Sequence, residues 1–231
     1  NDDAIRAVQL YARAAADAHM RVSVGLVVEQ AASRWAADPN EYIEKGMALR
    51  DDYRGDALVA THFALEPSHA LDDPTLARVR RLADELEIPV ALPVHESTWE
   101  MAESQARHGA RPLDRLLRLG FASPLLISVH GTNLLPADID ALAACGAAVV
   151  HCPESNLKLG SGVCPAADLV GRGVRVALGT DGAASNNDLD VLSEMRTAGL
   201  LAAGVSARPG ALVARDLLRM ATLEGARVLG L

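Results

Sequence analysis

The sequence lacks the features that mark several large classes of protein. Only 3% of its 231 residues are aromatic, and its three cysteines, Cys145, Cys152 and Cys164, form no CxxC pair. We therefore expect neither a disulfide framework nor a structural zinc knuckle, and reduced thiols fit a cytoplasmic protein. The longest apolar stretches are far shorter than the ~20 residues that a membrane-spanning helix needs, so we expect no membrane partner.

Positive charge is also scarce. The chain has 22 lysines and arginines against 30 aspartates and glutamates, which gives a formal net charge of −8. Such a surface does not attract a phosphate backbone, so a nucleic-acid partner is not expected. The chain begins at Asn1 without a basic region followed by an apolar segment, so nothing predicts export, and we expect that an upstream portion is absent.

What the sequence does have is a regular alternation of helical and apolar segments. Half of its residues are hydrophobic, which is enough for a substantial core. Apolar spacing of three and four predicts helices at residues 2–19, 40–51, 73–86, 98–118, 136–145, 164–172, 187–203 and 208–227. Between them lie six apolar runs, at residues 20–28, 57–67, 88–96, 124–132, 147–155 and 174–182. No low-complexity linker interrupts the pattern, so we expect one domain over residues 1–231.

The six apolar runs are nearly continuous in hydrophobicity and bounded by glycine and proline, which is typical of parallel strands buried on both faces. The fold class is therefore α/β, with either an open doubly wound sheet or most of a (β/α)8 barrel. Polar residues follow the runs at Glu66, at His95 and Glu96, at His130, at His151 and at Asp181. In a barrel all these strand ends meet at one mouth, which favours the barrel; no GxGxxG motif follows the first strand.

The strand-end residues suggest hydrolytic chemistry. His130 and Asp181 are a plausible pair of ligands for a divalent metal, and Glu96 could carry a proton between water and a leaving nitrogen. Each residue alone also fits an ordinary structural role. His130 could be a hydrogen-bonded strand-end histidine, Asp181 could cap a turn, and Glu96 could lie beside the cap of a helix that begins near Thr98.

Three segments carry a resemblance to a known family: "SVHGTNL", "HCPESNLKLGSGVCP" and "LGTDGAASNNDLDVLSEMRTAGLL". They resemble the amidohydrolase superfamily, in the branch of the 5-methylthioadenosine and S-adenosylhomocysteine deaminases and the chlorotriazine hydrolases. The resemblance runs from about residue 2 to the end of the chain. It implies a metal-dependent (β/α)8 barrel that hydrolyses an exocyclic amine, or another leaving group, on a nitrogen heterocycle. This chain would supply strand 3 to strand 8 of that barrel, without the flanking β-sandwich.

The resemblance also implies roles for individual residues. His130 matches a histidine ligand on the sixth strand and Asp181 matches the aspartate on the eighth, so the implied metal is zinc or iron(II). Glu96 matches the proton-shuttling glutamate of the fifth strand. His151 and Asn156 match a segment that lines the substrate pocket.

The chain departs from the family pattern at several positions. The fifth-strand motif resembles H-x-H-E-T, and here Pro93 stands where the first, metal-binding histidine should be. His95, two residues on, lies on the same strand face and could approach the metal, although in the family its position belongs to the substrate pocket. No HxH pair occurs in the chain, and its place would be upstream of Asn1. The substrate loop after the fourth strand of these deaminases resembles "PHAPYT"; here it is "LEPSHALDDPT", where Glu66 and His69 lie, and we expect Glu66 to contact the substrate.

Three of the five implied metal ligands are thus not available, and two interpretations stay open. In the first, upstream sequence supplies the HxH pair and the protein is a deaminase-type hydrolase of a C–N bond in a small nucleoside-like molecule. In the second, the branch has abandoned the metal. It is then either a metal-free enzyme that uses Glu96, His95, His130 and Asp181 as acid and base groups, or a catalytically silent protein that binds a ligand. Because six strands leave open parallel edges, we also expect a homo-oligomer.

Overall fold

The computed structural model describes residues 2–231 and has an α/β fold. Its strands are β1 Val22–Val28, β2 Val59–Leu65, β3 Val90–Val94, β4 Leu126–His130, β5 Ala148–His151 and β6 Arg175–Leu178. Its helices are α1 Asp2–Asp17, α2 Pro39–Asp52, α3 Asp73–Leu86, α4 Thr98–His108, α5 Pro112–Arg118, α6 Pro136–Cys145, α7 Pro153–Leu159, α8 Ala166–Gly171, α9 Val191–Ser206, α10 Ala214–Ala221 and α11 Leu223–Val228. Within residues 2–231, none of these helices is long and apolar enough to cross a bilayer.

The sheet has six parallel strands, and their order follows the sequence from β1 to β6. The chain forms two compact units, one up to Leu92 and the other from Pro93 to Leu231, so the boundary falls inside β3. The expectation of one domain over residues 1–231 stays a prediction.

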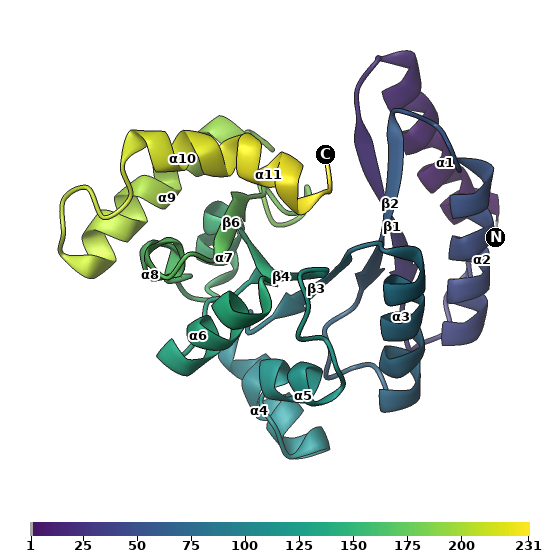
Figure 1. Ribbon diagram of the computed structural model, residues 1–231, viewed down its shortest axis with the longest axis horizontal. Coiled ribbons are helices and arrows are strands. Elements are labelled where there is room, and N and C mark those ends of the chain that lie inside the picture. Colours follow the sequence, from purple (N-terminus) through teal and green to yellow (C-terminus); the bar gives the residue numbers. More distant parts are fainter. Residues whose placement is uncertain (1) are drawn as a thin grey trace. The chain divides into compact units, whose positions relative to one another are not determined.

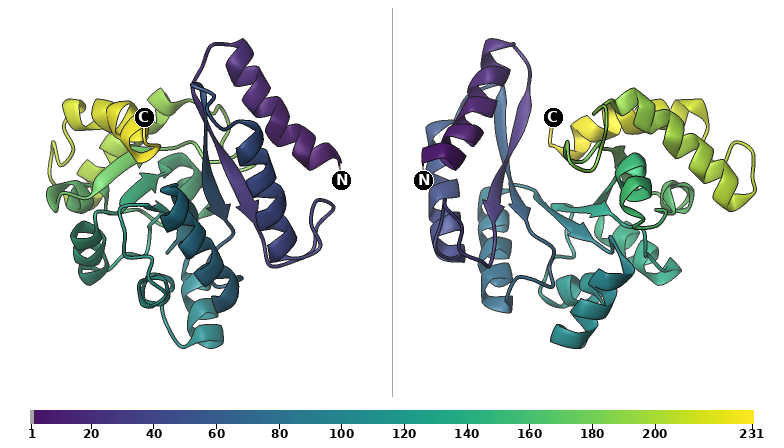
Figure 2. Two further views of the ribbon diagram at one scale, coloured as in Figure 1. Left: turned by 45° about the vertical axis from the view of Figure 1, so that its right-hand side comes forward. Right: turned by 180° about the vertical axis from the view of Figure 1, so that it is seen from behind.

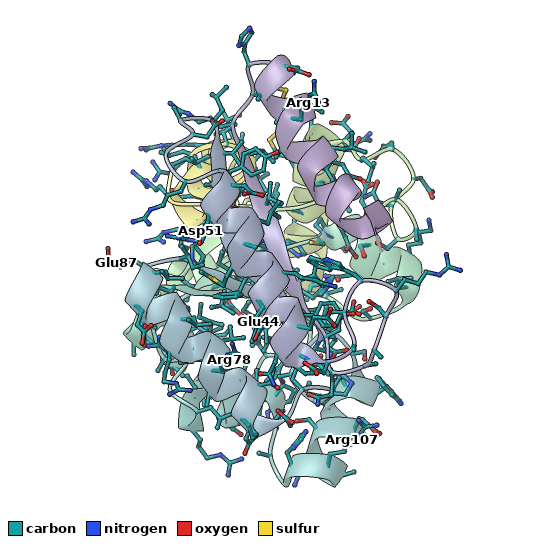
Figure 3. All side chains as sticks on the ribbon, turned by 90° about the vertical axis from the view of Figure 1, so that its right-hand side faces the viewer. Arg13, Glu44, Asp51, Arg78, Glu87 and Arg107 are labelled. Atoms are coloured by element: carbon teal, nitrogen blue, oxygen red, sulfur yellow. The ribbon has the colours of Figure 1, made fainter. Side chains whose placement is uncertain are left out.

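In the first unit, helices cover the paired strands β1 and β2. Every residue of β1 from Val22 to Val28 has a partner in β2, and β2 pairs in turn with the start of β3. Helices α1 and α2 pack on β1, and α3 lies beside α2 (Figures 1 and 2). Glu44 and Asp51 of α2 lie on its exposed face (Figure 3). The charged outer face and apolar inner face of α2 are those of a surface helix.

Side chains at the first turns explain where the helices of this unit begin. The Asp38 carboxylate accepts hydrogen bonds from the backbone N–H groups of Asn40 and Glu41, at 2.8 and 3.0 Å, and Pro39 occupies the first turn of α2. Asp72 caps α3 in the same way through the Thr75 N–H, at 2.8 Å. An aspartate at the cap satisfies N–H groups that the helix leaves without a partner, so both start points follow from the sequence.

In the second unit, β4, β5 and β6 pair in parallel, from Ile127 opposite Ala148 to His151 opposite Leu178. Helices α8, α10 and α11 pack against β6, and α9 packs on α10 (Figure 2). The core of this unit is mostly aliphatic. Its members, each no more than 1% exposed, include Leu113, Leu116, Phe121, Leu126, Leu142, Val149 and Leu169. Because apolar burial is the main stabilising term, this core holds the strand ends in place.

Two of the predicted helices are interrupted. The helix expected at residues 98–118 is two helices, because Gly109 takes a left-handed conformation with φ of 63° and Pro112 begins α5. The helix expected at residues 208–227 begins only at Ala214 and is divided at Thr222, which has φ of −134° and ψ of −88°. Glycine at a helix end and proline at a helix start were visible signals of the first break.

Candidate active site

Three predicted site residues follow strands of the second unit in a left-handed backbone conformation. His95 has φ of 57°, His130 has φ of 75° and Asp181 has φ of 62°. Left-handed backbone is uncommon for residues other than glycine, and such strain concentrates at functional sites. His95 directly follows β3, His130 ends β4 and Asp181 lies three residues after β6, so the strands position the polar groups.

His130 is buried and held by Asn156 from the start of α7. Its Nδ1 lies 2.9 Å from Asn156 Oδ1. Because an amide oxygen only accepts, Nδ1 carries a proton, and in the neutral ring Nε2 keeps its lone pair. Nε2 lies 3.8 Å from Glu96 Oε2. That distance is too long for a direct hydrogen bond, but it brings the predicted proton-transfer carboxylate and the imidazole together.

Two buried polar atoms near His130 have no partner. Asn156 Nδ2 and His151 Nδ1 make no hydrogen bond among the described residues, and both residues are only 1% exposed. Burial, followed by the nearby His130, lowers the pKa of His151 to about 4, so its ring is neutral at neutral pH. Because buried polar atoms are nearly always hydrogen-bonded, these two atoms are candidates for contacts with a bound molecule.

Asp181 is an exposed carboxylate with three donors. Its Oδ2 accepts from the hydroxyls of Ser155 and Ser185, both at 2.7 Å, and its Oδ1 accepts from the Gly182 N–H at 2.8 Å. Partial burial acts to raise the pKa of Asp181, but these hydrogen bonds and His130 outweigh it and hold the pKa below its usual value. Asp181 therefore stays ionised.

Glu96 is partly buried, and its backbone is held on both sides. Its N–H donates to Glu100 Oε2 at 2.6 Å, and its carbonyl accepts from the Thr132 hydroxyl at 2.6 Å. Thr132 follows β4 and also reaches the carbonyl of His95, at 3.2 Å. These bonds connect the loop after β3 to the loop after β4.

The ring of His95 contacts α5, α6 and the segment before α5. Its Nε2 accepts from the Leu113 N–H at 3.2 Å, and its Nδ1 lies 3.1 Å from Arg111 Nη2 and 3.5 Å from Asp138 Oδ2. Burial lowers the pKa of His95 to about 4; Asp138 acts to raise it and Arg111 lowers it further. The neutral ring is thus engaged at both nitrogens by α5, α6 and the segment before α5.

Glu66 belongs to the first unit, where it follows β2. Its Oε1 accepts from the backbone N–H of Gln30, and burial raises the pKa of its carboxyl, with Glu29 adding to the shift. Glu29 in turn accepts from the Tyr42 hydroxyl at 2.8 Å. Glu66 therefore lies in the first unit. The other predicted site residues lie in the second unit: His95, Glu96, His130, His151, Asn156 and Asp181.

The residues do not make a complete metal centre by themselves. No group of three or more histidine, cysteine, aspartate or glutamate side chains gathers in a metal-binding arrangement among residues 2–231. His130 and Asp181 offer two donors, and Pro93, with no side-chain donor, lies on the third strand. A catalytic zinc ion takes about three protein ligands and a water molecule, so this donor set does not fit one.

Several contributors were not predicted from the sequence. Glu100, Arg111, Asp138, Ser155 and Ser185 hold the predicted residues in place. Glu100 had a visible signal, because Ser97 and Glu100 have the spacing of a helix capping box. The others depend on contacts between loops, which local sequence patterns do not show.

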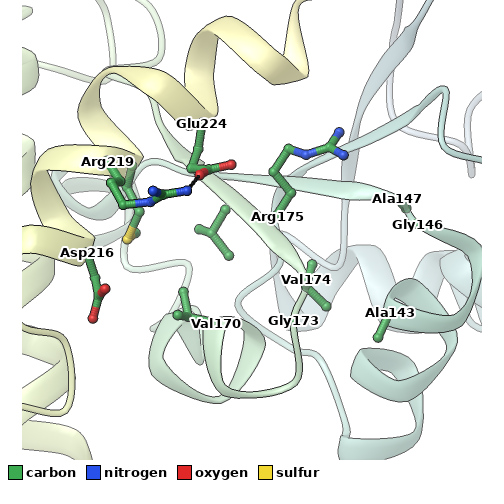
Figure 4. A pocket seen from close by; sticks show the side chains of 12 residues that line it. Ala143, Gly146, Ala147, Val170, Gly173, Val174, Arg175, Asp216, Arg219 and Glu224 are labelled. Atoms are coloured by element: carbon green, nitrogen blue, oxygen red, sulfur yellow. Dashed lines mark hydrogen bonds and ion pairs between the residues drawn. The ribbon is translucent and has the colours of Figure 1, made fainter.

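A cavity of about 360 Å³ lies elsewhere in the second unit, at the N-terminal ends of β5 and β6. Arg219 and Glu224 form an ion pair at 2.6 Å on its wall, and Arg175 and Asp216 also line it (Figure 4). None of the strand-end site residues lines this cavity. It is therefore separate from the candidate active site.

The parallel sheet, with histidine and carboxylate side chains at its carboxyl ends, has the arrangement found in α/β barrel proteins. The Amidohydro_1 model, described as "Amidohydrolase family", matches residues 2–231, so the chain belongs to the amidohydrolase family. A 5-methylthioadenosine/S-adenosylhomocysteine deaminase of Teredinibacter turnerae is 44% identical over 93% of this chain. One of Saccharophagus degradans is 41% identical over 95%.

Solved structures agree with this assignment. A crystal structure of an adenosine deaminase from Xanthomonas campestris with bound zinc is 47% identical, with a TM-score of 0.94 over 96% of this chain. Atrazine chlorohydrolase of Arthrobacter aurescens, complexed with zinc, has a TM-score of 0.89 over 97% at 23% identity, which shows the fold alone. The sheet thus corresponds to part of an amidohydrolase barrel, as the sequence predicted. The match covers 48% and 49% of the two curated relatives and 51% of the adenosine deaminase chain, so this chain spans about half their length.

Proposed function

We propose that this chain carries the proton-transfer residues of a hydrolytic deaminase that acts on a small nucleoside-like molecule. The observation that carries the proposal is the placement of Glu96 Oε2 3.8 Å from His130 Nε2, beside the unpartnered polar atoms of Asn156 and His151. The names of the curated relatives support adenine-type heterocycles as the substrate class.

The reaction assigns a distinct task to each side chain. Water adds to the carbon that bears the amino group, while Glu96 accepts a proton from the water and passes it to the adjacent ring nitrogen. Glu96 then moves the proton of the new hydroxyl to the amino nitrogen, the C–N bond breaks, and ammonia leaves while a carbonyl forms. We propose that His130 orients the attacking water through Nε2, that Asp181 remains an anion beside it, and that Asn156 and His151 contact the heterocycle.

A divalent ion such as zinc or iron(II) would supply hydroxide at neutral pH when it is bound. His130 and Asp181 would be its ligands from this chain, but two donors do not make a site.

A second candidate function is ligand binding without turnover. Pro93 and the two-donor set favour it, since both remove metal ligands while Asn156 and His151 remain available for contacts. The substrate-binding roles of His95 and Glu66 stay predictions from the sequence; in the second unit the ring of His95 is engaged by Leu113 and Arg111. This function would be supported if the purified protein binds 5-methylthioadenosine, measured by calorimetry, and releases no ammonia from it.

Replacing Glu96 tests the enzymatic proposal. Glu96→Gln keeps the shape of the side chain and removes the proton acceptor, so we expect ammonia release from 5-methylthioadenosine or S-adenosylhomocysteine to fall about 10²- to 10⁴-fold. Substrate affinity, measured by calorimetry, should be retained. Glu103→Gln is the matched control, because Glu103 lies on α4 and forms an ion pair with Arg107 of the same helix. Unchanged turnover in Glu96→Gln would contradict the proposal.

A further inference from the structure

Glu100 is a buried carboxylate directed at the backbone of the candidate active site. Only 2% of the residue is exposed, and it lies in the first turn of α4. Its Oε2 accepts from the N–H of Glu96 at 2.6 Å, and its Oε1 accepts from the N–H of His95 at 3.3 Å. Ser97, the N-cap of α4, accepts from the N–H of Glu100 at 3.2 Å.

This arrangement differs from an ordinary helix cap. In a capping box the acidic side chain bonds to the N–H of the cap residue, which here is Ser97. Glu100 instead reaches one and two residues further back, to Glu96 and His95. Burying a carboxylate is costly, and capping alone does not require it, because a glutamine serves as well in a capping box. The buried charge therefore points to a function in the loop it holds.

The loop itself needs such support. His95 has a left-handed backbone, with φ of 57°, and its N–H is one of the two that Glu100 binds. On the other side of Glu96, the Thr132 hydroxyl donates to the carbonyls of Glu96 and His95. The backbone of Glu96 is thus fixed at its N–H by Glu100 and at its carbonyl by Thr132, which limits the directions its side chain can take.

We propose that Glu100 is a positioning residue, which fixes the backbone of Glu96 and so aims the Glu96 carboxylate at His130 Nε2. The proposal rests on the proposed function insofar as Glu96 is the proton-transfer group. Burial raises the pKa of Glu100 to about 7, against the N–H groups of Glu96 and His95 that lower it, so at pH 8 the carboxylate is largely ionised and accepts both bonds.

The test uses Glu100→Gln at pH 8. Glutamine has the same shape, but its amide NH₂ would face one of the two N–H donors, so one bond is lost. We expect hydrogen–deuterium exchange at the Glu96 amide to become about tenfold faster. We also expect kcat to fall about tenfold or more while KM stays within about twofold, because a displaced catalytic group slows the chemical step rather than binding.

A matched control separates positioning from general destabilisation. Ser104→Ala removes a buried hydroxyl on the same helix that donates to the Ala110 carbonyl at 2.8 Å, away from Glu96. It should leave the exchange of the Glu96 amide and kcat unchanged. If Glu100→Gln fails to fold, Thr132→Val releases the Glu96 carbonyl instead and is expected to lower kcat in the same way.

A double variant shows whether Glu100 acts through Glu96. Glu96→Gln with Glu100→Gln should be no slower than Glu96→Gln alone, since a group that positions Glu96 has nothing left to position. Additive losses, or unchanged exchange at the Glu96 amide in Glu100→Gln, would overturn the proposal. If Glu96→Gln itself leaves turnover intact, the proposed function fails, and the exchange rate alone then decides whether Glu100 fixes the loop.

Discussion

Individual residues of the candidate active site are held in strained conformations by specific partners. A left-handed backbone at a residue other than glycine costs on the order of 1–3 kcal/mol. At His130 the partner is Asn156, and at Asp181 the partners are Ser155 and Ser185. The histidine and the carboxylate are therefore fixed before any ligand arrives, which is the condition that proton transfer and substrate orientation require.

Buried residues give the folding stability pH dependences of opposite sign. Burial raises the pKa of Glu100 from 4.5 to about 7, so between these values the folded state keeps a proton that the unfolded chain loses. The stability contributed by Glu100 therefore falls as pH rises. Burial lowers the pKa values of His95 and His151 from 6.5 to about 4, so the stability that these histidines contribute rises with pH over that range. In the wild type the slope from Glu100 opposes the slope from the two histidines.

Glu100→Gln removes the pH dependence of stability that Glu100 contributes and leaves the one that the buried histidines contribute. We expect the free energy of unfolding of this variant to increase with pH between about 5 and 7 more steeply than that of the wild type, by on the order of 1–3 kcal/mol over the range. Urea denaturation at several pH values measures it. Ser104→Ala should keep the wild-type slope, and parallel curves for wild type and Glu100→Gln would contradict the assignment.

The sequence predicted the residues that stand at strand ends and not those that support them. Glu96, His130 and Asp181 were found because each follows a buried strand, where parallel strands place catalytic groups. The Ser97 and Glu100 spacing was visible, but it does not show that the carboxylate is buried or that it reaches past the cap. That depends on the path of the loop after β3, which the structure alone gives.

Among the elements, β3 carries Pro93, which departs from the family pattern. Val90, Leu92 and Val94 are buried, whereas Ala91 and Pro93 are partly exposed, so these two share one face of the strand. Val94 accepts from the Gly131 N–H at 3.1 Å, which places the end of β3 beside the end of β4. A side chain at position 93 is thus carried on the strand next to the one that ends with His130.

Pro93→His tests whether position 93 decides metal binding. The variant would offer three donors, from positions 93, 130 and 181, which is the number that a catalytic zinc site takes from the protein. We expect its zinc affinity, measured by competition with a chelating dye, to exceed that of the wild type at least about tenfold. His130→Ala in the same background should remove the gain. Equal affinities for wild type and Pro93→His would contradict the account.

Element boundaries followed from the sequence where a cap or a proline marked them. The helices that begin after Asp38 and Asp72 were predicted within one residue, because aspartate and proline stand at both starts. The single helix expected at residues 98–118 was wrong, because apolar spacing continues across Gly109 and Pro112 and hides the break. Helix α7 was not predicted, since it has only seven residues, too few for a period to be visible.

Among the described residues, the sheet has one unpaired edge at each end of its strand order. Within the described residues, β1 pairs only with β2, and β6 pairs only with β5. An unpaired strand edge presents free N–H and C=O groups and promotes association. We expect the purified 231-residue chain to form oligomers, measured by size exclusion with light scattering. A monodisperse monomer at micromolar concentration would contradict this prediction.

We propose that the protein hydrolyses a C–N bond with Glu96 as the proton-transfer group. The most direct measurement follows 5-methylthioadenosine in water labelled with oxygen-18, for the wild type and Glu96→Gln. The account predicts one labelled oxygen in the product carbonyl for each ammonia released by the wild type, and a loss of both signals in the variant. Ammonia without label, or equal release by the two proteins, would contradict it.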